Sequence, residues 1–527
     1  MEDVLNLSPE EEASTRPSPT SSDRTILTAA KGSGIIFFGT LFEYTGRFAL
    51  GILLARMMGA EQYGLYSLAD SSTYMLIGIA LLGLDTGLVY FASIFASRRD
   101  EADLWGIVQI GLGLPFLLSL LGGISLFAFS DSLAQAIFHE TSLAPILRIA
   151  AFAIPCGAVA SAAVSVTRGL KQMHYKVIAQ DIVQTLIKLL LVALLAITGL
   201  TAIKAMVAYS VAMGVACLLL IYFVFRLLPP YQRAPISTRR SVKQMLGYSL
   251  PVYLTQLLFL FGPNLRTLLL GALNTVTAVG IFSVAARINM IGAAFYNSVA
   301  VMSMPLVSEL HSKNERGQLG NLYRTITKWT LTFNIPIFLL ILTFSKPILS
   351  IFGPTFVIGS LGLIILACGE LVNAATGISG SMVTMTGNTW LNAVNSIITL
   401  VLTLSLSIQL IPGFGMIGAA LATAMGVIVI NIIQVGEVFV LYRLLPYDRS
   451  FFKPVFAGCV SMLTTYAAMQ RIFTGNGLIS ITINASILVT TYISTILLLG
   501  LSREDQMILD RLYDRLNRVV FRRKGAQ

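Results

Sequence analysis

Charged side chains stand inside stretches of this sequence that are otherwise apolar. In "FEYTGRFALGILLARMMG", from Phe42 to Gly59, the carboxylate of Glu43 and the guanidinium of Arg47 lie four residues apart. That spacing places both groups on one face of a helix, where they can neutralise each other. The pair is therefore either a structural ion pair within one helix or part of a polar pathway through the membrane.

Several further cations occur at a similar depth in apolar stretches. Ionisable groups inside a membrane are costly, face the interior of a bundle, and commonly mark a pathway. Cations spread over five helices exceed what pairing between helices requires, so they predict a cationic cavity. The candidate residues are Arg47, Lys188, Arg266 and Arg287, with Arg148 nearer the outer end of its stretch.

Acids accompany these cations in the same stretches. Each acid could pair with a cavity cation when the site is empty, or take up a proton when it is buried without a partner. Both interpretations stay open. The candidates are Glu43, Asp70, Asp85 and Glu370.

The elements that must hold these groups are membrane-spanning helices. The chain has 527 residues, 55% of them hydrophobic and 12% charged, with a mean hydropathy of +0.79, which indicates a polytopic membrane protein. Transmembrane strands would alternate polar and apolar residues, whereas these stretches are apolar on most faces. We expect an all-α membrane protein with about 14 helices, near residues 34–57, 68–96, 104–129, 143–167, 176–199, 203–226, 245–271, 277–306, 327–351, 355–385, 389–411, 414–443, 452–473 and 478–500.

A weak internal repeat divides the chain. "LLARMMGAEQYGLYSLADSS" matches "LLLGALNTVTAVGIFSVAARI" at an offset of about 216 residues, which is a shift of six spans. An even shift keeps both copies in one orientation, so the repeats should be parallel. We expect two six-helix lobes, 32–226 and 245–443, around a central cleft, with a cytoplasmic linker at 227–244 and two further helices at 452–500.

The basic residues predict the orientation of the chain. Lys and Arg concentrate in alternate loops, which places both termini in the cytoplasm. Residues 1–31 are rich in Pro and Ser and are expected to form a disordered cytoplasmic tail. Residues 501–527 have the pattern of an amphipathic helix, either on the inner leaflet or docked on the protein's own loops.

The composition argues against several classes of function. The net charge of +11 follows the loop pattern, and no soluble basic domain for nucleic acid is visible. We expect no metal site and no cofactor, because the histidines lie far apart, the cysteines fall in apolar stretches, and no phosphate-binding loop occurs. A membrane glycosyltransferase or polymerase is the alternative enzyme, but the expected outer loops are short and almost uncharged.

Longer motifs resemble a known family. "KGSGIIFFGTLFEYTGRFALGILLARMMGAEQYGLYSLA" followed by "GLDTGLVYFAS" resembles the opening of Wzx-type polysaccharide flippases, which belong to the multidrug/oligosaccharidyl-lipid/polysaccharide exporter superfamily. Further similar segments are "VKQMLGYSLPVYL", "MPLVSELHSKNERGQLGNLYRTITKW" and "ILSIFGPTFV". Together they cover the first ten expected spans.

The resemblance implies a transporter in the cytoplasmic membrane and not an enzyme. Its cargo would be an oligosaccharide linked to polyprenyl diphosphate, carried between leaflets by alternating access. The diphosphate would then be bound first of all by Arg47, Arg266 and Arg287. Lys188 and Arg148 are secondary candidates for the same role. Besides this glycan and the lipid bilayer, other polysaccharide assembly proteins are candidate partners. A multidrug or lipid exporter of the same fold is the alternative transporter.

One departure from the superfamily concerns the cargo. Flippases of peptidoglycan precursors typically show a Leu-Gly-Phe-x-Arg-Asp pattern in the first helix. This chain reads Thr45-Gly46-Arg47-Phe48-Ala49-Leu50 instead, with the acid before the arginine. The resemblance therefore favours another glycan over a peptidoglycan precursor.

Overall fold

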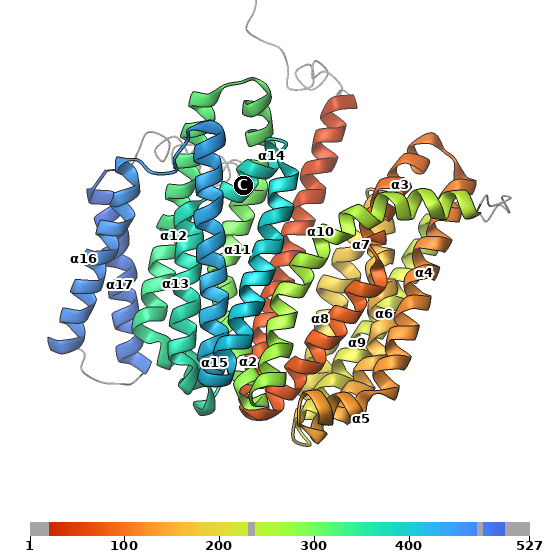
Figure 1. The fold of residues 1–527 in the computed structure, drawn as a ribbon, viewed down its shortest axis with the longest axis horizontal. Coiled ribbons are helices and arrows are strands. Elements are labelled where there is room, and N and C mark those ends of the chain that lie inside the picture. Colours follow the sequence, from red (N-terminus) through yellow and green to blue (C-terminus); the bar gives the residue numbers. More distant parts are fainter. Residues whose placement is uncertain (1–20, 230–237, 472–477, 501–527) are drawn as a thin grey trace, which may run out of the picture.

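The computed structural model describes residues 21–229, 238–471 and 478–500, and every regular element within them is a helix (Figure 1). Nine of the described helices are long and apolar enough to cross a membrane, or ten if a bent pair near the start counts as one span. The chain is thus a multi-pass membrane protein, and the expected all-α membrane fold is confirmed. The count of 14 spans stays a prediction.

The helices of the first half gather on one side of the molecule, where α4, α6, α8 and α9 stand together (Figure 1). Five short elements interrupt them, and one of these, η3, is a π-helix that leads directly into α8. The elements are α2 (Ser21–Leu81), α3 (Leu84–Arg98), α4 (Glu101–Ala128), α5 (Ser130–Ser132), η1 (Leu133–Ile137), η2 (Thr141–Leu143), α6 (Ala144–Gly169), α7 (His174–Lys176), η3 (Val177–Gln184), α8 (Thr185–Ala196) and α9 (Ala202–Leu227).

Most of the second half lies on the other side, with α16 and α17 at the far edge, whereas α10 runs from the side of α3 to the middle of the molecule (Figure 1). The two-lobe division with its boundaries stays a prediction. The elements are α10 (Thr238–Leu273), α11 (Val276–Ser312), α12 (Arg316–Ser350), η4 (Pro354–Gly359), α13 (Ser360–Thr376), α14 (Ser379–Met385), α15 (Thr389–Tyr442), η5 (Arg449–Phe451), α16 (Phe452–Arg471) and α17 (Leu478–Leu498).

Two glycines account for part of the difference between the number of helices and the number of expected spans. α2 bends at Gly59 (φ 75°) and α15 at Gly415 (φ 52°), and each helix runs through two expected spans. Glycine takes a positive φ without steric cost, so the chain can turn there with no connecting loop.

The ends of the expected segments also differ from the structure. α2 begins at Ser21 and α10 at Thr238, so residues 21–31 of the expected tail and the end of the expected linker are helical. The helix-forming residues of "TILTAAK" lie directly before the first apolar stretch, which lets the helix extend toward the N-terminus. Residues 1–20 and 501–527 lie outside the described ranges.

The two halves meet where α2 crosses α11, and we call Ala60, Gly64, Val276 and Gly280 the glycine crossing. A β-carbon at Gly64 would lie 2.0 Å from the carbonyl oxygen of Val276, and one at Gly280 would lie 1.9 Å from that of Ala60. Val276 is the repeat equivalent of Ala60, and Gly280 that of Gly64. The contact is therefore reciprocal, as expected of two copies related by a twofold axis.

Aromatic side chains from both halves close the core beside the glycine crossing. Tyr63 of α2 and Phe356 of η4 are both fully buried and pack edge to face, with ring centres 6.1 Å apart. Phe48 and Phe352 form a second edge-to-face pair at 5.9 Å. One apolar core thus extends across the two halves at this end of the bundle.

The glycine crossing leaves no room for even one methyl group. Gly280→Ala should lower the free energy of unfolding by about 1–3 kcal/mol, because the obstacle is backbone and cannot rotate away. Thermal unfolding of the purified protein in detergent measures the change. Gly214→Ala is the matched control: its β-carbon would meet nothing within 4 Å, so it should stabilise α9 by about 0.5–1 kcal/mol. Equal unfolding temperatures for the two variants would contradict the close approach.

Candidate functional site

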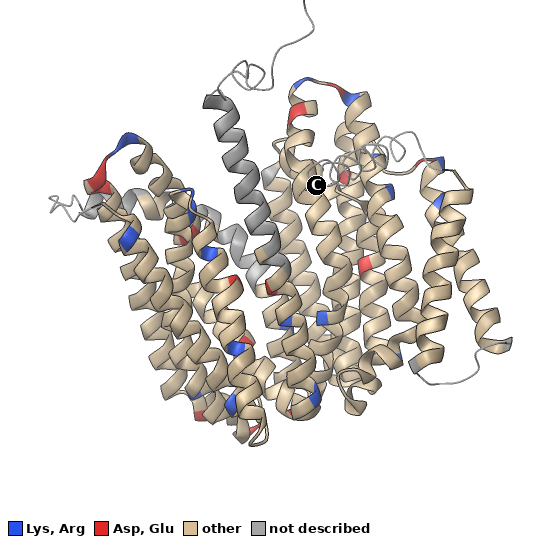
Figure 2. Cartoon of the chain, turned by 180° about the vertical axis from the view of Figure 1, so that it is seen from behind, with Lys and Arg blue, Asp and Glu red and all other residues tan. Residues whose placement is uncertain are grey.

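Most charged residues lie near the ends of the helices, and only a few stand along their middles (Figure 2). The largest group of the latter joins the two halves. Nη1 of Arg287, on α11, donates a hydrogen bond to the main-chain oxygen of Arg47, on α2, at 3.0 Å. Gly51 makes the approach possible, since a β-carbon there would lie 2.5 Å from the same Nη1.

Asp70 and Lys188 complete this group, and we call Arg47, Asp70, Lys188 and Arg287 the cation cluster. Asp70 is the acid of this group, and the charges of Lys188, Arg287 and Arg47 all act on its carboxylate. Its Oδ1 is buried and accepts no hydrogen bond from any residue that the structure describes. One acid is thus shared among three bases drawn from α2, α8 and α11.

Tyrosine rings supply further partners for the same cations. The ammonium of Lys188 lies 4.6 Å from the ring centre of Tyr209 and 5.7 Å from that of Tyr66. The guanidinium of Arg287 lies 6.0 Å from the ring centre of Tyr63. Faces of aromatic rings attract cations, most strongly where water is excluded. The rings can therefore hold the bases in place without neutralising them.

The cation cluster has an excess of positive charge that a ligand can reach. The side chain of Arg47 is 57% exposed, and Lys188, Arg287 and Asp70 are partly exposed. Guanidinium groups bind carboxylates and phosphates through paired, charge-assisted hydrogen bonds. The arrangement suits a polyanion with several oxygens.

A second set of charges adjoins Arg47, and we call Arg47, Glu43, Lys176 and Asp181 the ionic chain. Nη2 of Arg47 lies 2.9 Å from Oε1 of Glu43, whose Oε2 lies 3.6 Å from Nζ of Lys176. The same Nζ lies 2.7 Å from Oδ1 of Asp181, which is fully buried. The ionic chain therefore connects α2 to α7 and η3.

Sequence reasoning missed Lys176, because it stands at the first residue of the expected span 176–199, where a basic residue normally marks the loop side of a helix. Lys176 and Asp181 are five residues apart, a spacing that an α-helix does not place on one face. The π-helix η3 brings residues five apart together, which aligns the pair. The sequence signal for this pair is an acid, Asp181, that follows Lys176 closely at the start of an apolar stretch.

The other predicted site residues lie outside the cation cluster. Arg148 pairs with Asp131, and its Nε donates to Oγ of Ser130 at 3.1 Å, which ties α6 to α5. Arg266 is partly exposed on α10, and its Nε has no hydrogen-bond partner among the described residues. Its predicted contact with cargo, like that of Arg148, stays a prediction.

The remaining acids are also separate from the cation cluster. Oε1 of Glu370 accepts a hydrogen bond from Nδ2 of Asn373 at 3.2 Å, both on α13. Asp85 lies in the first turn of α3, and its buried Oδ1 has no hydrogen-bond partner within the described ranges. Their predicted roles in charge pairing or proton uptake stay predictions.

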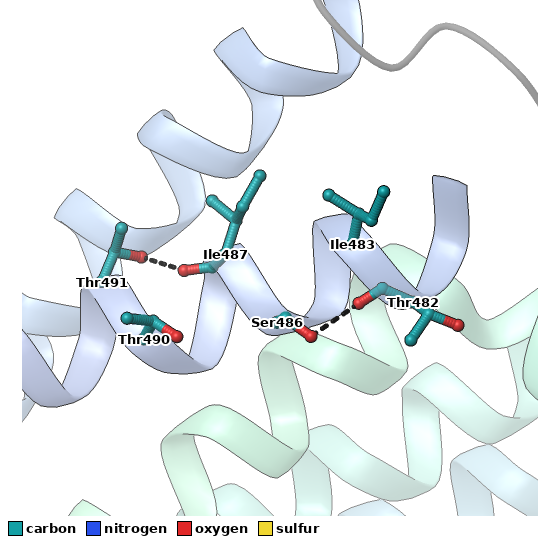
Figure 3. A pocket seen from close by; sticks show the side chains of 6 residues that line it. All are labelled: Thr482, Ile483, Ser486, Ile487, Thr490 and Thr491. Carbon is teal, nitrogen blue, oxygen red and sulfur yellow. Dashed lines mark hydrogen bonds between the residues drawn. The ribbon is translucent and has the colours of Figure 1, made fainter. Parts of the chain in front are cut away.

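A shallow hollow on α17 has different chemistry (Figure 3). Oγ of Ser486 donates to the main-chain oxygen of Thr482, and Oγ1 of Thr491 to that of Ile487. Oγ1 of Thr491 also bonds to Oγ of Ser461 on α16 at 3.2 Å, and none of the six lining residues is charged. The hollow therefore does not compete with the cation cluster as an anion site.

Comparison with known families gives two overlapping matches. Residues 29–311 match the model of a family described as polysaccharide biosynthesis protein. Residues 251–409 match the family model named MatE. The first match contains the cation cluster and the ionic chain, whereas the second lies mainly in the second half.

Individual relatives agree with these matches. A probable low-salt glycan biosynthesis flippase of Haloferax volcanii is 35% identical over 158 residues, which are 30% of this chain and 34% of the relative. The match thus spans about a third of that protein's length.

Solved structures show the same fold at low sequence identity. A lipid II flippase in an inward closed conformation aligns with a TM-score of 0.70 at 16% identity, covering 88% of this chain and 98% of the other. An inward-facing multidrug resistance transporter aligns with a TM-score of 0.64 at 16% identity, covering 76% and 94%.

Lys176 is the charge partner of Asp181, which is fully buried. The pair should therefore contribute to the free energy of unfolding. Lys176→Met should lower the free energy of unfolding by about 3 kcal/mol, because Asp181 then keeps an uncompensated charge. Adding Asp181→Asn should restore most of the loss in thermal unfolding. Arg148→Met is the control, since it breaks an exposed pair worth less than about 1 kcal/mol. A smaller loss for Lys176→Met than for Arg148→Met would contradict this geometry.

Proposed function

The chain belongs to the family of polysaccharide biosynthesis proteins, and from this premise we propose that it is a flippase for polyprenyl-diphosphate-linked oligosaccharides. It moves the head group from the inner to the outer leaflet of the cytoplasmic membrane, with both termini in the cytoplasm. The observation that carries the proposal is the cation cluster, in which Arg47 and Arg287 from opposite halves meet.

A diphosphate is the part of such a cargo that a membrane rejects most strongly. To enter the bundle it must give up water, and the replacement must come from groups of opposite charge. Arg47 and Arg287 offer forked donors to phosphate oxygens, and Lys188 adds a third charge. The cluster meets this requirement at a depth where the surrounding helices are apolar.

The glycine crossing supports transport by alternating access. It holds the halves together at one end of the bundle, which in the proposed orientation faces outward. Arg47 lies on the same helix, nearer its cytoplasmic start. Cargo would then enter from the inside, and separation of α2 from α11 would release it outside. No covalent bond changes, so the protein acts as a transporter.

Removing either arginine tests the role of the cation cluster. Arg47→Ala and Arg287→Ala should each slow translocation roughly tenfold to a hundredfold, since a lost charge-assisted hydrogen bond costs about 1.5–3 kcal/mol. Lysine at either position should recover part of the rate, as a point charge without the fork. The assay follows a fluorescent polyprenyl-diphosphate glycan across liposomes that contain the purified protein.

The same assay separates the alternatives. Arg148→Ala is the control and should retain translocation, because Arg148 pairs with Asp131 at an end of the bundle. Formation of new glycosidic bonds would identify a glycosyltransferase or polymerase instead. Export of cationic drugs with no glycan movement would identify a multidrug exporter. Normal translocation by the folded Arg47→Ala and Arg287→Ala variants would refute the assigned site.

A further inference from the structure

Glu43 lies between two cations on different elements. Its two carboxylate oxygens point to different partners, Oε1 to Arg47 at 2.9 Å and Oε2 to Lys176 at 3.6 Å. A shift of about 1 Å toward Lys176 would make that second contact a charge-assisted hydrogen bond. The Glu43 side chain is only 18% exposed, so water does little to stabilise it alone.

Lys176 has a close carboxylate partner in Asp181, whereas Glu43 stands between two cations. The lysine is held at 2.7 Å by Asp181, whose side chain is fully buried. Arg47, by contrast, is 57% exposed and is the member of the ionic chain that a ligand can reach. The four groups of the ionic chain have no net charge. An anion can therefore bind Arg47 tightly only if it displaces Glu43.

We propose that Lys176 is a positioning residue that takes over Glu43 when an anionic head group displaces this carboxylate from Arg47. The inference rests on the proposed function, because it describes how the same site is filled and emptied. Glu43 then changes partner without ever being an isolated ion in a low dielectric, a state that is strongly unfavourable. When the head group leaves, Glu43 returns to Arg47 and the site is reset.

The first test needs no cargo and measures unfolding temperature in detergent. The double variant Lys176→Met/Asp181→Asn removes the second partner of Glu43 and keeps the buried position neutral. Arg47→Ala alone should lower the unfolding temperature only slightly, because Lys176 accepts Glu43. Combining it with the double variant should give a loss at least twice the sum of the separate losses, and Glu43→Gln should remove the excess. Purely additive losses would overturn the proposal.

The second test measures binding of the fluorescent polyprenyl-diphosphate glycan to the purified protein. The double variant should bind it roughly tenfold more weakly, because displaced Glu43 has no other partner. In a Glu43→Gln background the double variant should change binding less than twofold, since an amide needs no counter-charge. An equal weakening in both backgrounds, or none in either, would overturn the role of Lys176.

The two tests distinguish a failure of the proposed function from a failure of the partner exchange. If the folded protein does not bind the glycan at all, the proposed function is wrong, and the unfolding temperatures still decide whether Lys176 accepts Glu43. If the glycan binds normally but the unfolding losses are additive, the flippase assignment stands and the exchange of partners is wrong.

Discussion

A charge placed inside a membrane has to be matched by something other than water, and this constraint organises the middle of the bundle. α2 carries most of the groups concerned: Glu43 and Arg47 before its bend, and Asp70 after it. The tyrosines that face Lys188 and Arg287 include two more residues of this helix. α2 therefore contacts both halves and supplies charges, counter-charges and aromatic faces at once.

The two predicted repeats differ in their chemistry. The repeat aligns Asp70 with Ala286 and Ser71 with Arg287, so each copy supplies a charge that the other lacks. The second half instead contains a hydrogen-bonded group of hydroxyl and amide side chains with a single acid at its end. Oγ1 of Thr376 donates to Oδ1 of Asn431 at 2.6 Å, Nδ2 of Asn431 donates to Oδ1 of Asn373, and Asn373 donates to Glu370. The first predicted repeat thus contributes mainly to an ionic site, and the second contains an amide-rich group.

Hydrophobicity alone was sufficient to predict the class of fold, because an apolar stretch of about 20 residues has few alternatives to a transmembrane helix. Arg47 and Arg287 could be selected because they are conspicuous in such stretches. Their meeting could not be predicted, since 240 residues separate them along the chain. Lys188 and the ring of Tyr209 were likewise not connected by any local pattern. The pairing of Arg148 with Asp131 depends on a turn between α5 and α6 that hydropathy does not describe.

The glycine crossing also restricts how the halves can move. Each glycine sits against a carbonyl oxygen of the opposite helix, so sliding either helix along the other drives an oxygen into a Cα. Rotation about the contact, or separation perpendicular to it, meets no such obstacle. Contacts of this kind consist of dispersion and weak Cα–H···O attraction, with no ion pair to break. Rotation of the two helices at the glycine crossing would therefore break no ion pair, and salt should not weaken this contact. Salt should weaken the charged site that the same two helices carry further along.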